Sequence, residues 1–137
     1  MDSGLFNSTT VPVLEQVIAF SQSRHALLAG NVANIDTPGY RVRDLSVDAF
    51  QQALKNAIEA KDKPSEPLSP GMIGVDRNEA MREVHESMKS ILYHDESDVG
   101  MEQQVTELVK NQMMHNLAID IMSSQYRLLQ TAISERV

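Results

Sequence analysis

Neither cysteine nor tryptophan occurs in this 137-residue sequence, and basic residues are in deficit. Without cysteine there is no disulfide framework and no thiolate chemistry. Lysine and arginine together number 12 against 19 aspartates and glutamates, which gives a formal net charge of −7. Nucleic-acid binders of this size carry a basic surplus or stripe, so the composition argues against that class.

Targeting and membrane segments are also missing. No uncharged apolar run approaches the roughly 20 residues that a membrane helix needs. The stretch MDSGLFNSTT at the beginning has neither the basic region nor the long apolar core of a secretory signal peptide. We therefore expect a soluble chain, which would leave the cytoplasm, if at all, by another route.

The sequence contains no pattern of residues typical of an active site. Nucleophile-elbow, phosphate-loop and dinucleotide-glycine motifs are absent, and the four histidines lack metal-ligand spacing. The stretch HDESDVG departs from a calcium loop, because Val99 takes a ligand position and Thr106 stands where the bidentate glutamate belongs. We expect no catalytic residue, no cofactor and no metal ion.

What the sequence does contain is helical periodicity at both ends. Residues 9–34 predict a helix, with Thr9 or Thr10 as cap and Pro12 tolerated in the first turn. The residues expected to contact a partner helix, which we call the seam, recur at spacings of four and three. They are Leu14, Ile18, Ser21, His25, Leu28 and Val32. Only Glu15 and Arg24 are charged between residues 3 and 35, fewer than a solvated face carries. Either this chain or other subunits must cover that helix.

Residues 99–134 predict a longer helix with the same alternation over more than four heptads. Eight of its ten expected seam positions are apolar: Met101, Val105, Leu108, Gln112, His115, Ile119, Met122, Tyr126, Leu129 and Ile133. In an antiparallel pair, the polar members Ser21 and His25 would lie level with Gln112 and His115. We interpret these four as a hydrogen-bonded polar layer that fixes the register, in preference to a ligand site.

The middle of the chain is less regular. Residues 40–47 begin with an alternation of large and basic residues that predicts a short extended piece. Residues 46–60 and 77–94 predict short helices, and residues 91–93 suggest a strand. Three prolines and two glycines mark 61–76 as a linker. The predicted fold is mainly α with little β. Residues 1–34 and 95–137 would form a coiled-coil-like core, and residues 35–94 the turn and the irregular middle.

The stretch NVANIDTPGY, residues 31–40, interrupts the first helix abruptly. Asn34 can end a helix in a left-handed conformation, and Thr37 is held extended by the proline that follows it. Thr37–Tyr40 fits a type II turn in which Gly39 takes positive φ. Asn31 and Asn34 lie one turn apart, where two side-chain amides can bond to a closely packed neighbour.

LLAGNVANIDTPGYRVRDL resembles the N-terminal signature of the bacterial flagellar axial proteins, the rod and hook family. DESDVGMEQQVTELVKNQMMHNLAIDIMSSQYRLLQTAI is similar to the C-terminal helix of that family. Gly30 departs from the family pattern, in which serine or asparagine is commoner, and the middle of this chain is its own. The assembly motif carried over by the resemblance comprises Asn31, Ala33, Asn34, Thr37, Pro38, Gly39 and Tyr40.

The resemblance implies a structural subunit of the basal-body rod, exported by the flagellar type III apparatus without a cleaved signal peptide. Implied partners are other copies of itself, neighbouring rod proteins and the FliE adapter at the inner-membrane ring. The alternative is a soluble helical adaptor that binds a partner helix in its groove. A rod subunit would assemble open-ended or in rings, whereas an adaptor would keep a small fixed stoichiometry.

Overall fold

The computed structural model describes residues 10–62, 77–92 and 100–135. Their order is α2 (Val11–Asn34), β1 (Arg43–Leu45), α3 (Val47–Asp62), α4 (Arg77–Glu86), β2 (Ser90–Leu92) and α5 (Met101–Ser134). Four helices and two three-residue strands in this part of the chain confirm the mainly α prediction. Two compact units are present, one of residues 1–43 and 92–137 and the other of residues 44–91. The sequence prediction placed the boundary after residue 34 and so assigned residues 35–43 to the middle of the chain.

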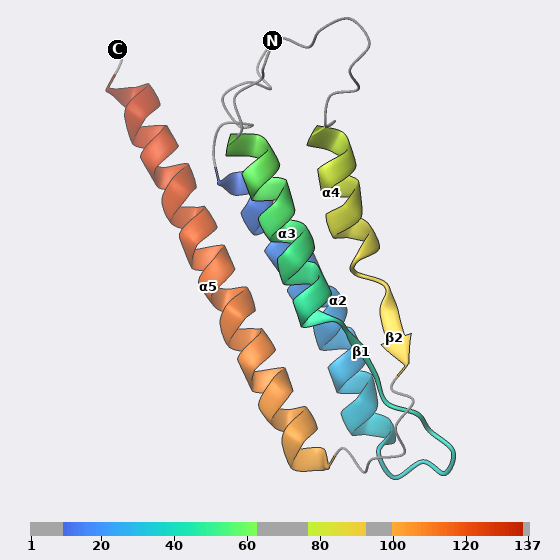
Figure 1. The fold of residues 1–137 in the computed structure, drawn as a ribbon. Helices are drawn as coiled ribbons and strands as arrows, with labels where there is room; N and C mark the ends of the chain where they lie inside the picture. Colours follow the sequence, from blue (N-terminus) through green and yellow to red (C-terminus); the bar gives the residue numbers. More distant parts are fainter. Residues whose placement is uncertain (1–9, 63–76, 93–99, 136–137) are drawn as a thin grey trace, which may run out of the picture. The chain divides into compact units, whose positions relative to one another are not determined.

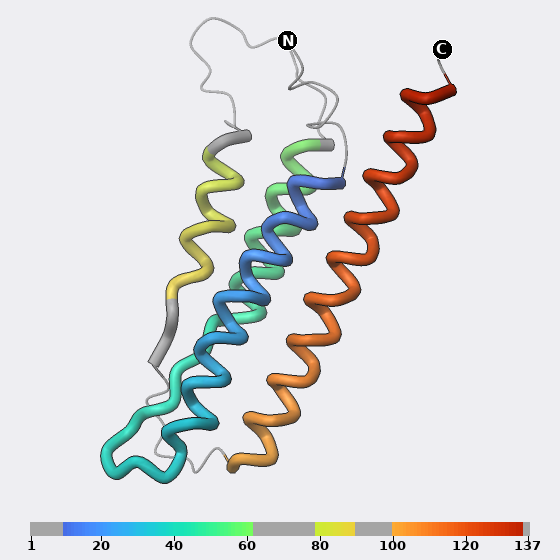
Figure 2. The backbone as a smooth tube through the Cα atoms, turned by 180° about the vertical axis from the view of Figure 1, so that it is seen from behind, coloured from blue at the N-terminus to red at the C-terminus, as the bar shows by residue number. Residues whose placement is uncertain are grey.

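The first unit is built on α2 and α5, which lie side by side and run antiparallel (Figures 1 and 2). Pro12 lies in the first turn of α2, where its missing N–H costs nothing, and Thr10 is the cap residue without a side-chain cap hydrogen bond. Gly100 precedes α5. In the stretch HDESDVG, the carboxylates of Asp95, Glu96 and Asp98 would favour a helix start through the helix dipole, but these three residues lie outside the described residues.

The length of α5 exceeds what α2 can cover. Ser21 bonds to Asn111 and His115, and each step forward along α2 is a step back along α5. Val11, ten residues before Ser21, therefore lies opposite residues 121–125. The last turns of α5 extend past the first turn of α2 (Figure 2). Leu129, which would meet those first turns if the two helices were centred on each other, lies beyond them.

The second unit contains α3 and α4, packed antiparallel (Figure 1). Ser46 caps α3, since its Oγ accepts a hydrogen bond from the Ala49 N–H at 3.1 Å. Phe50 and Ala57 of α3 and Val84 of α4 are buried, as their helical spacing predicts. The predicted linker lies outside the described residues except for Lys61 and Asp62, which end α3.

Strands β1 and β2 pair in a two-stranded sheet, and the boundary between the two units falls within both strands. The extended piece predicted at residues 40–47 contains strand β1, Arg43–Leu45. The strand suggested at residues 91–93 is present at Ser90–Leu92.

Candidate assembly site on the terminal helices

Asn31 is fully buried and makes four side-chain hydrogen bonds. Its Nδ2 donates to the Arg43 carbonyl at 2.6 Å and to Gln104 Oε1 at 3.1 Å. Its Oδ1 accepts from the Tyr40 hydroxyl at 3.0 Å and from the Arg43 N–H at 3.2 Å. An amide offers two donors and two lone pairs, so every capacity of Asn31 is used. This one side chain joins α2, the following turn and α5.

Asn34 plays a smaller part than Asn31. Its Nδ2 donates to the Gly30 carbonyl of its own helix at 2.8 Å. The expected left-handed conformation is wrong for this residue, because Gly39 has the only positive φ in the described ranges. The backbone instead continues right-handed through Ile35. Of the two amides predicted to bond to a packed neighbour, Asn31 alone reaches α5.

The turn at Thr37–Tyr40 has the predicted geometry. The Tyr40 N–H donates to the Thr37 carbonyl at 3.1 Å, and Gly39 has φ of 77°. Thr37, Pro38 and Gly39 are exposed. The turn brings the Tyr40 ring back to Asn31, so the exposed corner is anchored by a buried amide.

Substituting Gly39 with valine tests this turn. No atom lies within 4 Å of a Cβ built at Gly39, so the cost comes from backbone strain alone. A β-branched residue at positive φ should lower the free energy of unfolding by about 2 kcal/mol, measured by urea titration. Gly39→Asn is the matched control and should cost clearly less, because asparagine tolerates this region. Equal costs for the two variants would contradict the assignment.

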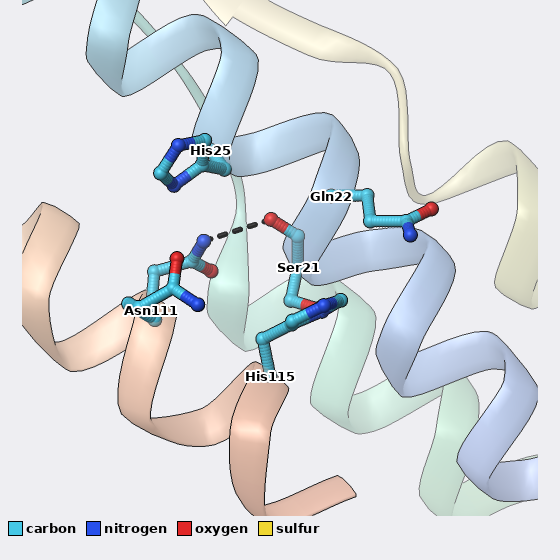
Figure 3. A pocket seen from close by; sticks show the side chains of 6 residues that line it. Ser21, Gln22, His25, Asn111 and His115 are labelled. Atoms are coloured by element: carbon cyan, nitrogen blue, oxygen red, sulfur yellow. Dashed lines mark hydrogen bonds between the residues drawn. The ribbon is translucent and has the colours of Figure 1, made fainter. Parts of the chain in front are cut away.

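A polar layer lies where the two helices cross-bond, and it holds Ser21 and His115 of the four predicted members, with Asn111 added. His25 and Gln112 are exposed, and Gln112 bonds to Asn116 of its own helix. Ser21 Oγ and His115 Nδ1 are 2.8 Å apart, and Asn111 Nδ2 donates to the Ser21 carbonyl at 2.7 Å (Figure 3). Ser21 Oγ also donates to the Ile18 carbonyl at 2.9 Å. The single hydroxyl proton of Ser21 therefore has two acceptors within reach, and the donor in the Ser21–His115 bond depends on the histidine tautomer.

A cavity of about 170 Å³ opens beside this layer, lined by Ser21, Gln22, His25, Asn111, Gln112 and His115 (Figure 3). Asn111 is buried, and its Oδ1 has no hydrogen-bond partner in the described structure. The parts of the chain that are described hold no cluster of three or more histidine, aspartate or glutamate side chains suited to a metal ion. The cavity therefore presents amides, imidazoles and one unsatisfied acceptor.

An ion pair completes the contact between the two helices. Arg24, whose side chain is 8% exposed, donates to Glu107 Oε2 at 2.9 Å, and Lys110 bonds to Glu107 Oε1 at 3.0 Å. The hydrogen bond from Lys110, and then that from Arg24, lowers the pKa of Glu107 below its ordinary value, against the opposing effect of burial. Glu107 thus bonds both to a buried cation of α2 and to a surface cation of its own helix.

The lowered pKa of Glu107 predicts a pH dependence. A carboxylate whose folded pKa is depressed adds stability above its unfolded pKa, and loses that contribution as the pH falls through the folded pKa. Glu107→Gln should therefore be less stable than the parent at neutral pH, and the gap should shrink below about pH 4.5, the ordinary value for this group. Asp120→Asn, an exposed carboxylate of α5, is the control. A gap independent of pH would argue against the ion pair.

The faces through which α2 and α5 contact each other are rotated about the helix axes by about one residue position from the predicted seams. In α2, Ser21 and Leu28 are buried as predicted, but Arg24 and Asn31 take the places expected for His25 and Val32. His25 is exposed, while Leu14, Ile18 and Val32 are half-buried. In α5 the buried residues are Gln104, Asn111 and Ala118, each one position before Val105, Gln112 and Ile119. Leu108, His115, Met122 and Leu129 are half-buried.

The contact faces are rotated because the two helices approach each other closely. Gln104, Asn111 and Ala118 recur every seven residues and are amide or small side chains, which let two helices approach and bond across the contact. The remaining predicted positions are exposed: Met101, Val105, Gln112, Ile119, Tyr126 and Ile133. Sequence reasoning missed Arg24, Gln104, Asn111 and Ala118, although the seven-residue recurrence of small and amide residues was a usable signal.

This chain pairs long helices from its two ends and carries a smaller helical unit between them in the sequence. Among curated proteins, the chain is similar to the flagellar basal body rod protein FlgB of Bacillus subtilis (strain 168). The two are 21% identical over 129 residues, which cover 93% of this chain and 95% of that protein.

A second similar protein is the flagellar basal body rod protein FlgB of Aquifex aeolicus (strain VF5). It is 26% identical over 130 residues, covering 92% of this chain and 94% of its own length. No protein-family model matches the chain, and no solved structure matches it. Both similarities run nearly end to end, so they include the terminal helices and the middle unit alike. In the described ranges, no helix is long and apolar enough to cross a membrane.

Proposed function

We propose that this protein is a structural subunit of the bacterial flagellar basal-body rod, with no catalytic activity. Similarity to two FlgB proteins over more than nine tenths of the chain supports the proposal. The structural observation that best supports the proposal is the exposed apolar surface of α5. Ten large apolar residues of that helix are exposed in the isolated chain: Met101, Val105, Val109, Met113, Leu117, Ile119, Ile121, Tyr126, Leu128 and Ile133.

So much exposed apolar surface on one helix marks an interaction surface. A rod subunit surrounded by its neighbours would bury it, together with the charge-poor outer face of α2. The predicted seam residues that α2 does not cover would then be buried between subunits. The assembly motif at Asn31–Tyr40 fixes the direction in which the chain leaves α2, and so shapes the edge of that interface.

In finer detail, the subunit belongs to the proximal rod in the periplasm. It assembles with copies of itself and with neighbouring rod proteins, and it contacts the FliE adapter near the inner-membrane ring. Torque passes through these contacts toward the hook and filament. The flagellar type III apparatus exports the chain unfolded, which suits a sequence without cysteine. No cofactor, nucleic acid or membrane-spanning segment takes part.

Deleting the gene and restoring it on a plasmid tests this function. The deletion should abolish swimming and leave cells without rods, hooks or filaments, and the wild-type gene should restore all three. Ile119→Lys should fail to restore swimming, because it places a charge on the exposed surface of α5, where the free chain tolerates it. Asp120→Lys, on the neighbouring position, is the matched control and should restore swimming. A deletion strain with normal flagella would refute the proposal.

The rival reading is a soluble adaptor that binds one partner helix on the same surface. The exposed face of α5 alone fits both readings, and the mode of association separates them. Purified rod subunit should associate without a fixed limit as its concentration rises, as heterologous contacts do. An adaptor should stay monomeric until its partner is added and then form a complex of one fixed stoichiometry.

A further inference from the structure

All the sulfur of this chain is in methionine, because cysteine is absent. Methionine is therefore the side chain that two-electron oxidants such as hydrogen peroxide attack first. Of the eight methionines, those that lie in the described ranges and are half-buried are Met81, Met88, Met114 and Met122. Met101 and Met113, both on α5, are exposed by 47% and 68%. Met113 is the most exposed methionine in the part of the chain that the structure describes.

Met113 lies inside an apolar row on the surface of α5. Val109, Met113, Leu117 and Ile121 are four residues apart, so they follow one another along one side of the helix, and we call them the Met113 row. Their exposed fractions are 52%, 68%, 60% and 40%. Met113 comes two positions after Asn111, which bonds to α2, so a rotation of about 200° about the helix axis separates the two side chains. Met113 therefore points away from the contact with α2.

Peroxide converts the thioether of methionine to a sulfoxide. A sulfur lone pair attacks one peroxide oxygen, the O–O bond breaks, and the second oxygen leaves as water after it takes the proton of the transferred hydroxyl. The sulfur loses two electrons and the peroxide gains them. The product replaces a flexible apolar side chain with one that carries a strong dipole. Methionine sulfoxide reductases reverse the change, so the side chain has two interconvertible chemical states.

We propose that Met113 is an oxidation site whose chemical state decides whether the Met113 row can be buried by a neighbouring molecule. The thioether is apolar and matches Val109 and Leu117 on either side of it. The sulfoxide oxygen would lose its water on burial, and the side chains of the row have no hydrogen-bond donor to replace it, so the buried state would lose free energy. The inference rests on the proposed function, because assembly into the rod is what would cover α5.

Sensitivity to oxidants is confined to the free chain. The exposed fraction of Met113 in the isolated protein leaves its sulfur open to small oxidants. Once neighbouring molecules cover the row, the same contacts that need a reduced Met113 also shield it. Oxidation before assembly therefore blocks the surface, whereas oxidants that arrive after assembly do not reach it. The site adds a chemical condition to assembly, namely that the chain arrives with Met113 reduced.

Hydrogen peroxide is the probe for the first test, with sulfoxide at each methionine followed by mass spectrometry of peptides. In the purified full-length protein, Met113 should oxidise at least about threefold faster than Met114, the half-buried neighbour that serves as internal control. In purified basal bodies, Met113 should oxidise about tenfold more slowly than in the free chain. Equal rates for Met113 and Met114 in the free chain would overturn the inference. So would an unchanged rate for Met113 in basal bodies that contain the protein.

The second test asks whether the sulfoxide opposes association. Light scattering of the purified protein at rising concentration is compared before and after peroxide, and each variant is judged against its own untreated sample. The concentration at which the parent associates should rise about tenfold after oxidation, because a desolvated dipole enters the contact. Met113→Leu cannot form the sulfoxide and should show little change on treatment. Met101→Leu, the matched control at the other exposed methionine, keeps Met113 and should respond as the parent does.

The outcome of these tests is separable from the proposed function. Equal responses of the parent and Met113→Leu to peroxide would remove the oxidation site. The rod role would stand in that case, provided that the chain is found in basal bodies. Absence of the chain from basal bodies would remove the rod role, whatever the rates of oxidation in the free protein.

Discussion

Replacing Asn31 with alanine should lower the free energy of unfolding by about 3 kcal/mol, one of the two largest effects expected in this chain. The change removes four hydrogen bonds and leaves the buried Gln104 amide and the Arg43 backbone without their partner. Chemical denaturation of the purified protein, followed by circular dichroism, measures the loss.

Asn34→Ala is the matched control for Asn31→Ala. Both changes replace asparagine by alanine in the last turns of α2, so the gain in helix propensity is similar and cancels between them. Asn34 bonds only to the Gly30 carbonyl of its own helix among the contacts described. Its replacement should cost about 1 kcal/mol or less. Similar losses for the two variants would show that Asn31 does not join the turn to α5.

Leu28→Ala should have an effect of the same size for a different reason. Leu28 is 1% exposed in the middle of the face that α2 turns toward α5. Removing a fully buried isobutyl group loses its transfer free energy and leaves a cavity, which together cost about 3 kcal/mol. The protein should unfold at a lower denaturant concentration with an unchanged slope.

Leu117→Ala provides the control for that variant. It makes the same chemical change on the partner helix, at a side chain that is 60% exposed. We expect a loss of at most about 0.5 kcal/mol in the isolated chain. If Leu117→Ala destabilised the isolated protein as much as Leu28→Ala, the exposed face of α5 would have to be covered in the monomer. The proposed interface between copies would then lose its basis.

The sequence predicted the features of the fold that depend on local chemistry, namely the two long helices and the turn at Gly39. Both long helices follow from apolar spacing, and their observed bounds, Val11–Asn34 and Met101–Ser134, lie within two residues of the prediction. The turn at Gly39 follows from the proline and glycine themselves. Part of the polar layer was also predictable, because Ser21 and His115 are polar members of the two predicted seams, although the helices are not centred on each other.

What the sequence did not predict is which face of each helix meets the other. Hydrophobicity favours the large residues at Val105 and Ile119, but the backbones approach along Gln104, Asn111 and Ala118. Hydrogen bonds such as Asn111 to the Ser21 carbonyl decide this, and they depend on interhelical distance, which a spacing pattern does not contain. The residues that spacing assigns to one seam can also be divided between two contacts, one with a helix of the same chain and one with another molecule.

Mass spectrometry of purified basal bodies shows directly whether this chain is a rod subunit. We expect this chain to be present in several copies per basal body, to remain after the filaments and hooks are stripped, and to disappear together with the rod in a strain that lacks its gene. Intact rods that contain none of this protein, with the chain found free in the cytoplasm, would contradict the account.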